Sequence, residues 1–155
     1  MTHHDPDQKF AKLVEGQRLV MFTTRQESGA LVSRPMTVQE HEGDVFRFIA
    51  QNDNAVTREA DGQQVNLSVI DGGTYLSISG RCHVERDVAK KRELWNRINE
   101  AYADDPEDPN NIILEVTAES GEYWDSGNTV TQLFGIAKAA ITGNKPDGDH
   151  GTVQL

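Results

Sequence analysis

The sequence contains only one cysteine, Cys82, so no disulfide can form within the chain. A single thiol is typical of proteins in reducing compartments. No apolar run approaches the roughly 18 residues that a membrane-spanning helix needs. The first residues, MTHHDPDQKF, are polar and unlike a signal peptide. We therefore expect a soluble, cytoplasmic protein.

Positive charge is also scarce. The chain has 15 Lys and Arg residues against 25 Asp and Glu, which gives a formal net charge of -10. Nucleic acids and anionic membranes bind surfaces with a net basic footprint, so neither is expected as a partner. A local basic pocket for one small anion is compatible with this balance. At 155 residues, with 36% hydrophobic and 6% aromatic residues, the chain is expected to form one domain over residues 1–155.

Several common site motifs are missing. There is no Gly-rich phosphate loop ending in Lys-Ser/Thr and no G-x-G-x-x-G. The five histidines are scattered, and the acidic stretch at residues 104–108 lacks the glycine and distal glutamate of a calcium loop. No serine stands in a G-x-S-x-G setting. We therefore predict no metal site, and no residue is identified as catalytic.

The pattern of apolar residues predicts mostly strands. Alternation or short apolar runs bounded by turn residues indicate strands at 17–24, 30–38, 44–50, 65–70, 74–85 and 112–125. Helices are expected at 6–15, 56–60, 87–102 and 129–143, and a flexible tail at 144–155. Six strands in mostly hairpin order predict a mainly β, α+β fold, an antiparallel barrel with peripheral helices.

The stretch LVSRPMTV, residues 31–38, reads as a strand interrupted at Arg34-Pro35. Proline cannot donate to a sheet ladder, so it belongs at an edge, a strand start or a bulge. Either this is an edge strand with a solvated arginine, or something other than a strand lies against it. Arg34 could then offer its forked donors to a carbonyl or a phosphate.

The stretch NDNAVTREADG, residues 52–62, predicts a short helix capped by Asn54 or Asp53. Free N–H groups at a helix start favour an anion, and Thr57 and Arg58 lie within the first turn or so. A plain helical connection is the alternative.

Seven pieces of the sequence, taken in order, resemble the pyridoxamine 5'-phosphate oxidase-like flavin-binding split barrels, specifically the general stress protein branch. They are MFTT, SRPM, VFRFIA, QVNLSV, YLSISGRCHVERD, ELWN and EYWDS. The ending AKAAITGNKPDG…TVQL is similar as well, so the resemblance runs from about Phe10 to the C-terminus. It implies an antiparallel six-stranded split β-barrel and a homodimer with two flavin sites at its interface.

The resemblance also implies site residues. Those that match the family's FMN site are Arg34, Pro35, Met36, Phe48, Ile49, Ala50, Asp53, Thr57, Arg58 and Trp124. The first three match a wall beside the isoalloxazine ring, and the next three match the strand on its other side. The helix that follows receives the phosphate, and the aromatic residue matching Trp124 approaches from the second subunit. The interrupted strand is thus expected to face a flavin.

The chain departs from the branch at the phosphate. A small hydroxyl residue and, two positions later, a lysine are usual, but here Asp53 and Ala55 stand there. One lost charged contact, of order 1.5–3 kcal/mol, would weaken FMN about 10- to 150-fold. Thr57 and Arg58 are expected to compensate in part. FAD or a deazaflavin stays open as an alternative cofactor.

These features predict an FMN-binding general stress protein with weak or specialised oxidoreductase activity. Pyridoxamine phosphate oxidation itself is not expected, because the chain ends Thr-Val-Gln-Leu where that enzyme has Arg-Leu-x-Pro. Two alternatives stay open. One is a non-catalytic flavin or nucleotide binder that acts as a sensor or reservoir, and the other is a dimeric scaffold that has lost flavin.

Overall fold

The computed structural model describes residues 19–98, 105–125 and 149–155, together with Pro6 and Gln8. Within these ranges it contains eight strands and two helices. The strands are β1 (Leu19–Arg25), β2 (Leu31–Thr37), β3 (Glu40–Glu42), β4 (Val45–Gln51), β5 (Gln64–Asp71), β6 (Thr74–Glu85), β7 (Asn111–Asp125) and β8 (Asp149–Gln154). The helices are α2 (Ala55–Ala60) and α3 (Val88–Arg97).

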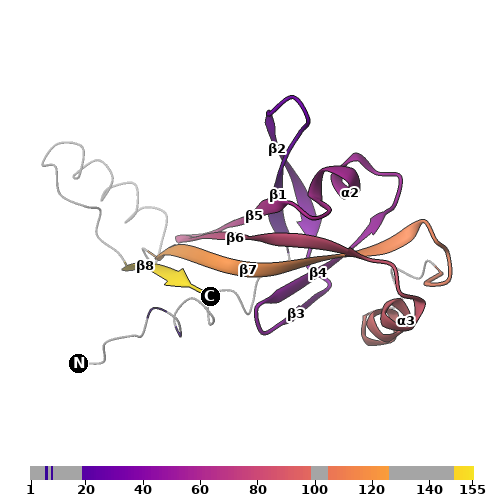
Figure 1. The fold of residues 1–155 in the computed structure, drawn as a ribbon. Helices are drawn as coiled ribbons and strands as arrows, with labels where there is room; N and C mark the ends of the chain where they lie inside the picture. Colours follow the sequence, from indigo (N-terminus) through magenta and orange to yellow (C-terminus); the bar gives the residue numbers. More distant parts are fainter. Residues whose placement is uncertain (1–5, 7, 9–18, 99–104, 126–148) are drawn as a thin grey trace, which may run out of the picture.

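All strand pairs are antiparallel and belong to one sheet, in the order β2-β1-β5-β6-β7-β4-β3, with β8 added on β7. The 15-residue strand β7 is the centre of this arrangement (Figure 1). It pairs with β4 near its start, with β6 along most of its length and with β8 near its end.

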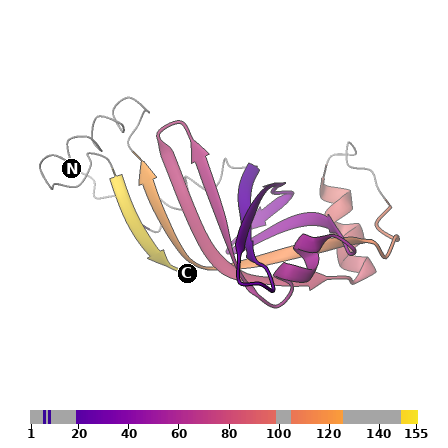
Figure 2. The same cartoon turned by 90° about the horizontal axis from the view of Figure 1, so that it is seen from above.

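The sheet is curled, and the β1–β2 hairpin and α2 lie at its curled part (Figure 2). The ends of β6 and β7 run out beyond this curl and form an arm together with β8, whereas α3 lies at the opposite end of the molecule. Elements that are distant in the chain are thereby brought together. In particular, α2 packs against β1 and β6.

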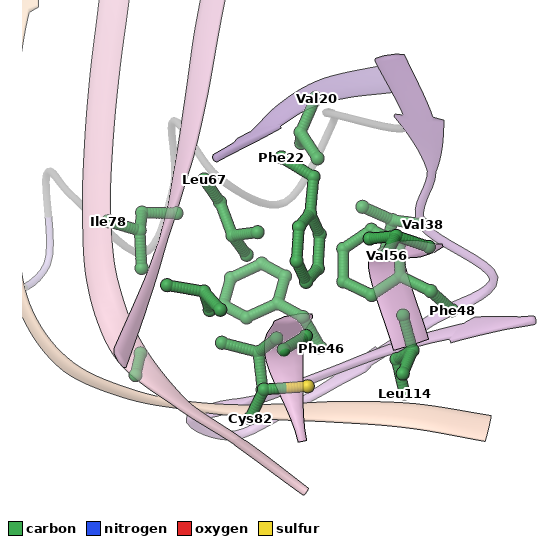
Figure 3. Close-up of a cluster of buried hydrophobic side chains, with 14 of the residues drawn as sticks. Val20, Phe22, Val38, Phe46, Phe48, Val56, Leu67, Ile78, Cys82 and Leu114 are labelled. Carbon is green, nitrogen blue, oxygen red and sulfur yellow. The ribbon is translucent and has the colours of Figure 1, made fainter. Parts of the chain in front are cut away.

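Alternation of the side chains explains why the sheet curls around a core. Along β4 the residues Phe46, Phe48 and Ala50 are buried, and those between them are half-buried. The rings of Phe22 and Phe48 meet edge to face at 5.2 Å in the middle of the cluster (Figure 3). This geometry is favourable for aromatic pairs beyond the area that they bury.

Two local features fix the curl. The register of β6 against β7 shifts between Ser79 and Gly80, which is typical of a β-bulge. At Gly80 the two backbones approach so closely that a Cβ atom would collide with the carbonyl oxygen of Thr117. Only glycine fits there, since it has no side chain.

The predicted fold class, a mainly β, antiparallel split barrel with peripheral helices, is confirmed. The six predicted strands are all present, and Asp87 caps α3 as its side chain accepts from the Lys90 N–H at 3.1 Å. The strand count of six was too low, because β3 and β8 are also paired. The helix expected at 87–102 is shorter than predicted, because α3 ends at Arg97 and Ile98 is extended. The helices expected at 6–15, apart from Pro6 and Gln8, and at 129–143 lie outside the described residues.

Two further expectations are corrected. The flexible tail predicted for residues 144–155 is wrong for its last part, because β8 pairs with β7 from Asp149 to Gln154 and buries Val153. The strand predicted to be interrupted at Arg34-Pro35 is continuous. It pairs with β1 from Leu31 to Thr37 without a register shift, and Pro35 lies opposite Met21. Neither described helix is long and apolar enough to span a membrane.

Candidate functional site

The segment that holds Arg34 and Pro35 is an edge strand. Within the described residues β2 pairs only with β1, so its other side carries no neighbouring strand. An edge is the position where a proline is tolerated in a sheet. Pro35 is exposed, and Met36 is partly buried against the core.

The Arg34 side chain turns inward from this edge. Its Nη1 donates to the hydroxyl of Thr24, a buried residue on β1, at 2.7 Å. Its Nη2 lies 3.5 Å from Oε1 of Glu59 on α2. Both carboxylate oxygens of Glu59 are buried and accept no hydrogen bond from the part of the chain that the structure describes. Arg34 is therefore the cation that balances a buried carboxylate, and it ties the β1–β2 hairpin to α2.

Some of the residues predicted around the phosphate are accessible to a ligand, and others are already bonded within the fold. Asn54, not Asp53, caps α2, since its side chain accepts from the Val56 N–H at 3.1 Å. Thr57 is buried, and its hydroxyl donates to the backbone carbonyl of Gln51 at 2.7 Å. Arg58 and Asp53 are exposed, and Arg58 donates to the Asp53 backbone carbonyl at 3.0 Å. Arg58 is thus accessible to a ligand, whereas the donor of Thr57 is already used within the fold.

The three β4 residues predicted beside the ring alternate across the sheet. The side chains of Phe48 and Ala50 are in the core, and Ile49 is half-buried on the opposite face. Phe48 packs against Phe22 and has no exposed surface. Any approach of a ligand to Phe48 and Ala50 would therefore be to their backbone.

Trp124 lies on the arm, away from α2. It pairs with Tyr75 on β6, six residues before Arg81, which corresponds to about 20 Å along a strand. Its ring is 41% exposed and stacks on that of His150 at 5.0 Å. His150 Nε2 in turn lies 3.4 Å from Glu122 Oε2. Within one chain the structure does not bring Trp124 to the other predicted site residues.

A pocket of about 730 Å³ opens beside α2. Small-molecule sites usually have volumes of about 300–1,000 Å³. Its walls are residues 25–27 at the end of β1 and the following turn, Ala55, Arg58 and Glu59 of α2, and Gln63, Gln64 and Arg81. Of the residues predicted from the sequence to bind the cofactor, only Arg58 lines it. Arg34 does not line the pocket, but it forms an ion pair with Glu59, which does.

Three arginines in this lining have no carboxylate partner among the described residues. Arg25 donates to the Gly29 carbonyl at 3.3 Å, Arg58 to that of Asp53 at 3.0 Å, and Arg81 to that of Gly62 at 2.9 Å. No carboxylate among the described residues forms an ion pair with any of the three. By contrast, each of Arg34, Arg47, Arg92 and Arg97 is paired with a glutamate. The lining therefore holds three arginines without an ion-pair partner among the described residues, beside Glu27 and the paired Glu59.

Sequence reasoning missed Arg25 and Arg81. Arg25 lies between two predicted strands and Arg81 within a third, and no sequence motif includes either of them. The pairing of β1 with β5 and of β5 with β6 brings their ends to α2, and Gln64 is the register partner of Arg81. Only a correct prediction of which strands pair, and in which register, could have shown that Arg25 and Arg81 lie close to α2.

Other reactive groups lie outside the pocket. Burial, reinforced by the negative charge of Asp61, raises the pKa of the Cys82 thiol to about 12. The thiol is therefore protonated and inert at neutral pH. Among the described residues no group of three or more His, Cys, Asp or Glu side chains is placed to hold a metal ion.

Comparison with known proteins places this geometry in a family. The family described as pyridoxamine 5'-phosphate oxidase like matches residues 5–147. No curated protein gives a significant match.

Solved structures share the fold. A Clostridium acetobutylicum protein related to general stress protein 26, of the pyridoxinephosphate oxidase family, is 20% identical with a TM-score of 0.70, over 98% of this chain and 97% of that one. The general stress FMN/FAD binding protein of Xanthomonas citri is 26% identical with a TM-score of 0.62, over 78% and 89%. An F420 reductase is 21% identical with a TM-score of 0.57, over 72% and 94%. Since the family match spans most of the sequence, this chain belongs to the pyridoxamine 5'-phosphate oxidase-like family.

Proposed function

We propose that this protein binds FMN as a homodimer and acts as a flavin-dependent oxidoreductase. The observation that carries the proposal is the pocket of about 730 Å³ beside α2. Its lining combines glutamines and two glutamates with three arginines that form no ion pair with a described carboxylate. The anionic tail of a nucleotide fits such a lining. Membership of the family, and a 26% identical relative named as an FMN/FAD binding protein, support the choice of a flavin.

In this proposal the chain supplies position and electrostatics. A bound flavin would supply hydride transfer. The open edge of β2, at Pro35 and Met36, would border the ring on one side, and the backbone of β4 at Ile49 and Ala50 on the other. Arg34 would hold Glu59 and α2 in place, because its guanidinium already contacts that carboxylate.

The second subunit would complete the site. Trp124 is exposed at the end of the arm and, within its own chain, far from α2. In a homodimer the arm of one protomer could carry this ring to the flavin of its partner. His150 stacks on Trp124 and would fix the ring in its orientation.

A non-catalytic flavin binder is the second candidate. The described lining contains arginine, glutamine, glutamate and alanine, but no histidine, tyrosine, lysine or cysteine. A site without these common proton donors suits storage or sensing of a nucleotide as well as turnover.

The test is a titration of flavin-free protein with FMN, FAD and riboflavin, followed by fluorescence quenching, with the subunit count measured by light scattering. We expect FMN to bind at micromolar affinity or better to a dimer. Steady oxidation of NADH or NADPH by the FMN complex would support the oxidoreductase, and tight binding without turnover would support the binder. No binding of any flavin would overturn both.

A further inference from the structure

We propose that β8 is a pH-dependent clip, which is held on β7 more tightly when His150 carries a proton. Below neutral pH it would lie firmly on the edge of β7 with His150 stacked on Trp124, and it would loosen as the pH rises. This regulation is a property of the chain's own strands, so it goes beyond the proposed function and does not depend on it.

The clip covers a stretch of β7 that no other described strand covers on that side (Figure 2). The partner of β7 is β4 from Asn111 to Thr117 and β8 from Ser120 to Asp125. Without β8 the backbone groups of the second stretch would be unpaired, as at any open sheet edge. Detachment of β8 would therefore expose a strand edge and one face of the Trp124 ring.

Few groups attach β8 on its core side. Val153 is its only large apolar side chain, and it is buried. Gly151 lies so close to the ring of Tyr123 that a Cβ atom would collide with it. The Leu155 N–H adds one hydrogen bond, to the Glu119 carbonyl at 2.8 Å. Because the apolar contacts are so few, contacts on the outer face form a large share of what holds the strand.

On the outer face, His150 contacts two residues of β7. Its ring stacks on that of Trp124, with centroids 5.0 Å apart and planes at 12°, and its Nε2 lies 3.4 Å from Oε2 of Glu122. A neutral imidazole can donate only an ordinary hydrogen bond. A protonated imidazole adds a charge-assisted hydrogen bond and places a cation over an aromatic face. Protonation therefore strengthens both contacts, in the range between pH 5 and 8 where histidine changes its charge.

The groups around His150 do not oppose its protonation. Glu122 has no other ion-pair partner among the described residues. Asp125, also on β7, lies on the opposite side of the strand by alternation. Tyr75 is on β6, two strands away from β8, and Asp149 precedes His150 in the chain. These neighbours on β6, β7 and β8 are acidic or uncharged, so the protonated form of β8 is the one that fits its surroundings.

Hydrogen exchange of the β8 amides, measured on the full chain as purified, tests the clip. Wild-type protein is compared with His150→Phe, which keeps a stacking ring but cannot take up a proton, at pH 5.5 and again at pH 8.5. Since each comparison is made at one pH, the intrinsic pH dependence of exchange cancels. At pH 5.5 we expect the amides of residues 152–155 to exchange about 2- to 10-fold more slowly in the wild type, the range for an exposed ion pair with a cation–aromatic contact. At pH 8.5 the two proteins should exchange alike.

Two more variants separate the clip from general effects. Glu122→Gln removes the charge of the acceptor and should reduce the difference seen at pH 5.5. His83→Gln is the matched control, because His83 lies 3.3 Å from Glu85 in a second exposed pair, on a part of β6 away from β8. It should leave the exchange of β8 unchanged at both pH values.

The proposal is overturned if wild-type protein and His150→Phe exchange alike at pH 5.5, or if they differ equally at both pH values. The amides of β4 report on the rest of the sheet in the same experiment. Faster exchange that is confined to β8 supports the clip, whereas faster exchange shared by β4 indicates general destabilisation and counts against it.

Discussion

Arg34 and Glu59 form an ion pair, at 3.5 Å, that joins the edge strand β2 to α2. The Glu59 carboxylate is buried and accepts no hydrogen bond from the described residues. Arg34 also donates a hydrogen bond to the hydroxyl of Thr24. Removal of one partner of a buried pair leaves the other charge without compensation. The contact thus makes the charge in the neighbouring pocket depend on Arg34, which does not line it.

Replacement of Glu59 by glutamine should strengthen FMN binding. The change removes a negative charge from the lining of the arginine pocket and frees Arg34 to add to its positive potential. We expect roughly a tenfold lower dissociation constant for FMN, equivalent to about 1.4 kcal/mol, and no change for riboflavin. Fluorescence titration measures both. Glu93→Gln, on the exposed surface of α3, serves as the control, and weaker FMN binding by Glu59→Gln would contradict the electrostatic account.

The thiol of Cys82 should be unreactive in the native protein. Burial, together with the charge of Asp61, raises its pKa to about 12, so almost no thiolate exists at pH 8. A chromogenic disulfide reagent should therefore label the unfolded chain within minutes and the native protein only at the rate of unfolding. Fast labelling under native conditions would show that the strand pairing around Cys82 opens.

The same thiol should make stability fall at high pH. In the unfolded chain it ionises with a pKa of about 8.5. Because the folded value is raised, the unfolded state loses its proton first and gains stability as pH rises above that value. The free energy of unfolding should decrease from about pH 8.5 upward, and Cys82→Ala should reduce the decrease in a series of denaturant titrations.

Phe48→Leu should change stability more than flavin affinity. The Phe48 ring is completely buried and packs edge to face on Phe22. A change of shape at such a position costs about 0.5–3 kcal/mol of unfolding free energy. FMN affinity should stay at the wild-type value, because only the backbone of Phe48 is available to a ligand. A loss of affinity at unchanged stability would place the side chain in the flavin site after all.

Gly80→Ala should destabilise the fold severely. A methyl group there would collide with the backbone carbonyl oxygen of Thr117, which cannot move without disturbing the pairing of β6 with β7. We expect a loss of about 1–3 kcal/mol or more, measured by denaturant unfolding. The neighbouring Ser79→Ala adds no atoms and should cost much less, since it removes only one of the two hydroxyl groups to which the Asn66 amide donates.

The sequence predicted the strands that carry apolar alternation, and it missed those that lack it. β3 is three polar residues, and DHGTVQ in β8 has one large apolar side chain. Both owe their conformation to a longer partner strand, a tertiary effect that outweighs local propensity. The family's fold could be predicted because seven short stretches of the sequence that resemble the family occur in the right order.

The candidate site was only partly accessible from sequence. Arg58 could be singled out because it lies on the helix after β4, where the resemblance places a phosphate. Arg25 and Arg81 could not, because their proximity depends on strand registers over more than fifty residues of chain. Conversely, the resemblance predicted that Phe48 and Thr57 lie at the ligand. Their side chains are instead buried, because of the alternation along β4 and the packing of α2.

The position of Pro35 has a consequence for the behaviour of the protein in a crowded cell. An open sheet edge is a template on which strands of other chains can add and start aggregates. Within the described residues β2 pairs only with β1, and Pro35 in this edge strand has no N–H to offer a neighbouring strand. Pro35 thus leaves the edge of β2 accessible to a small molecule and disfavours the addition of further strands at the same place.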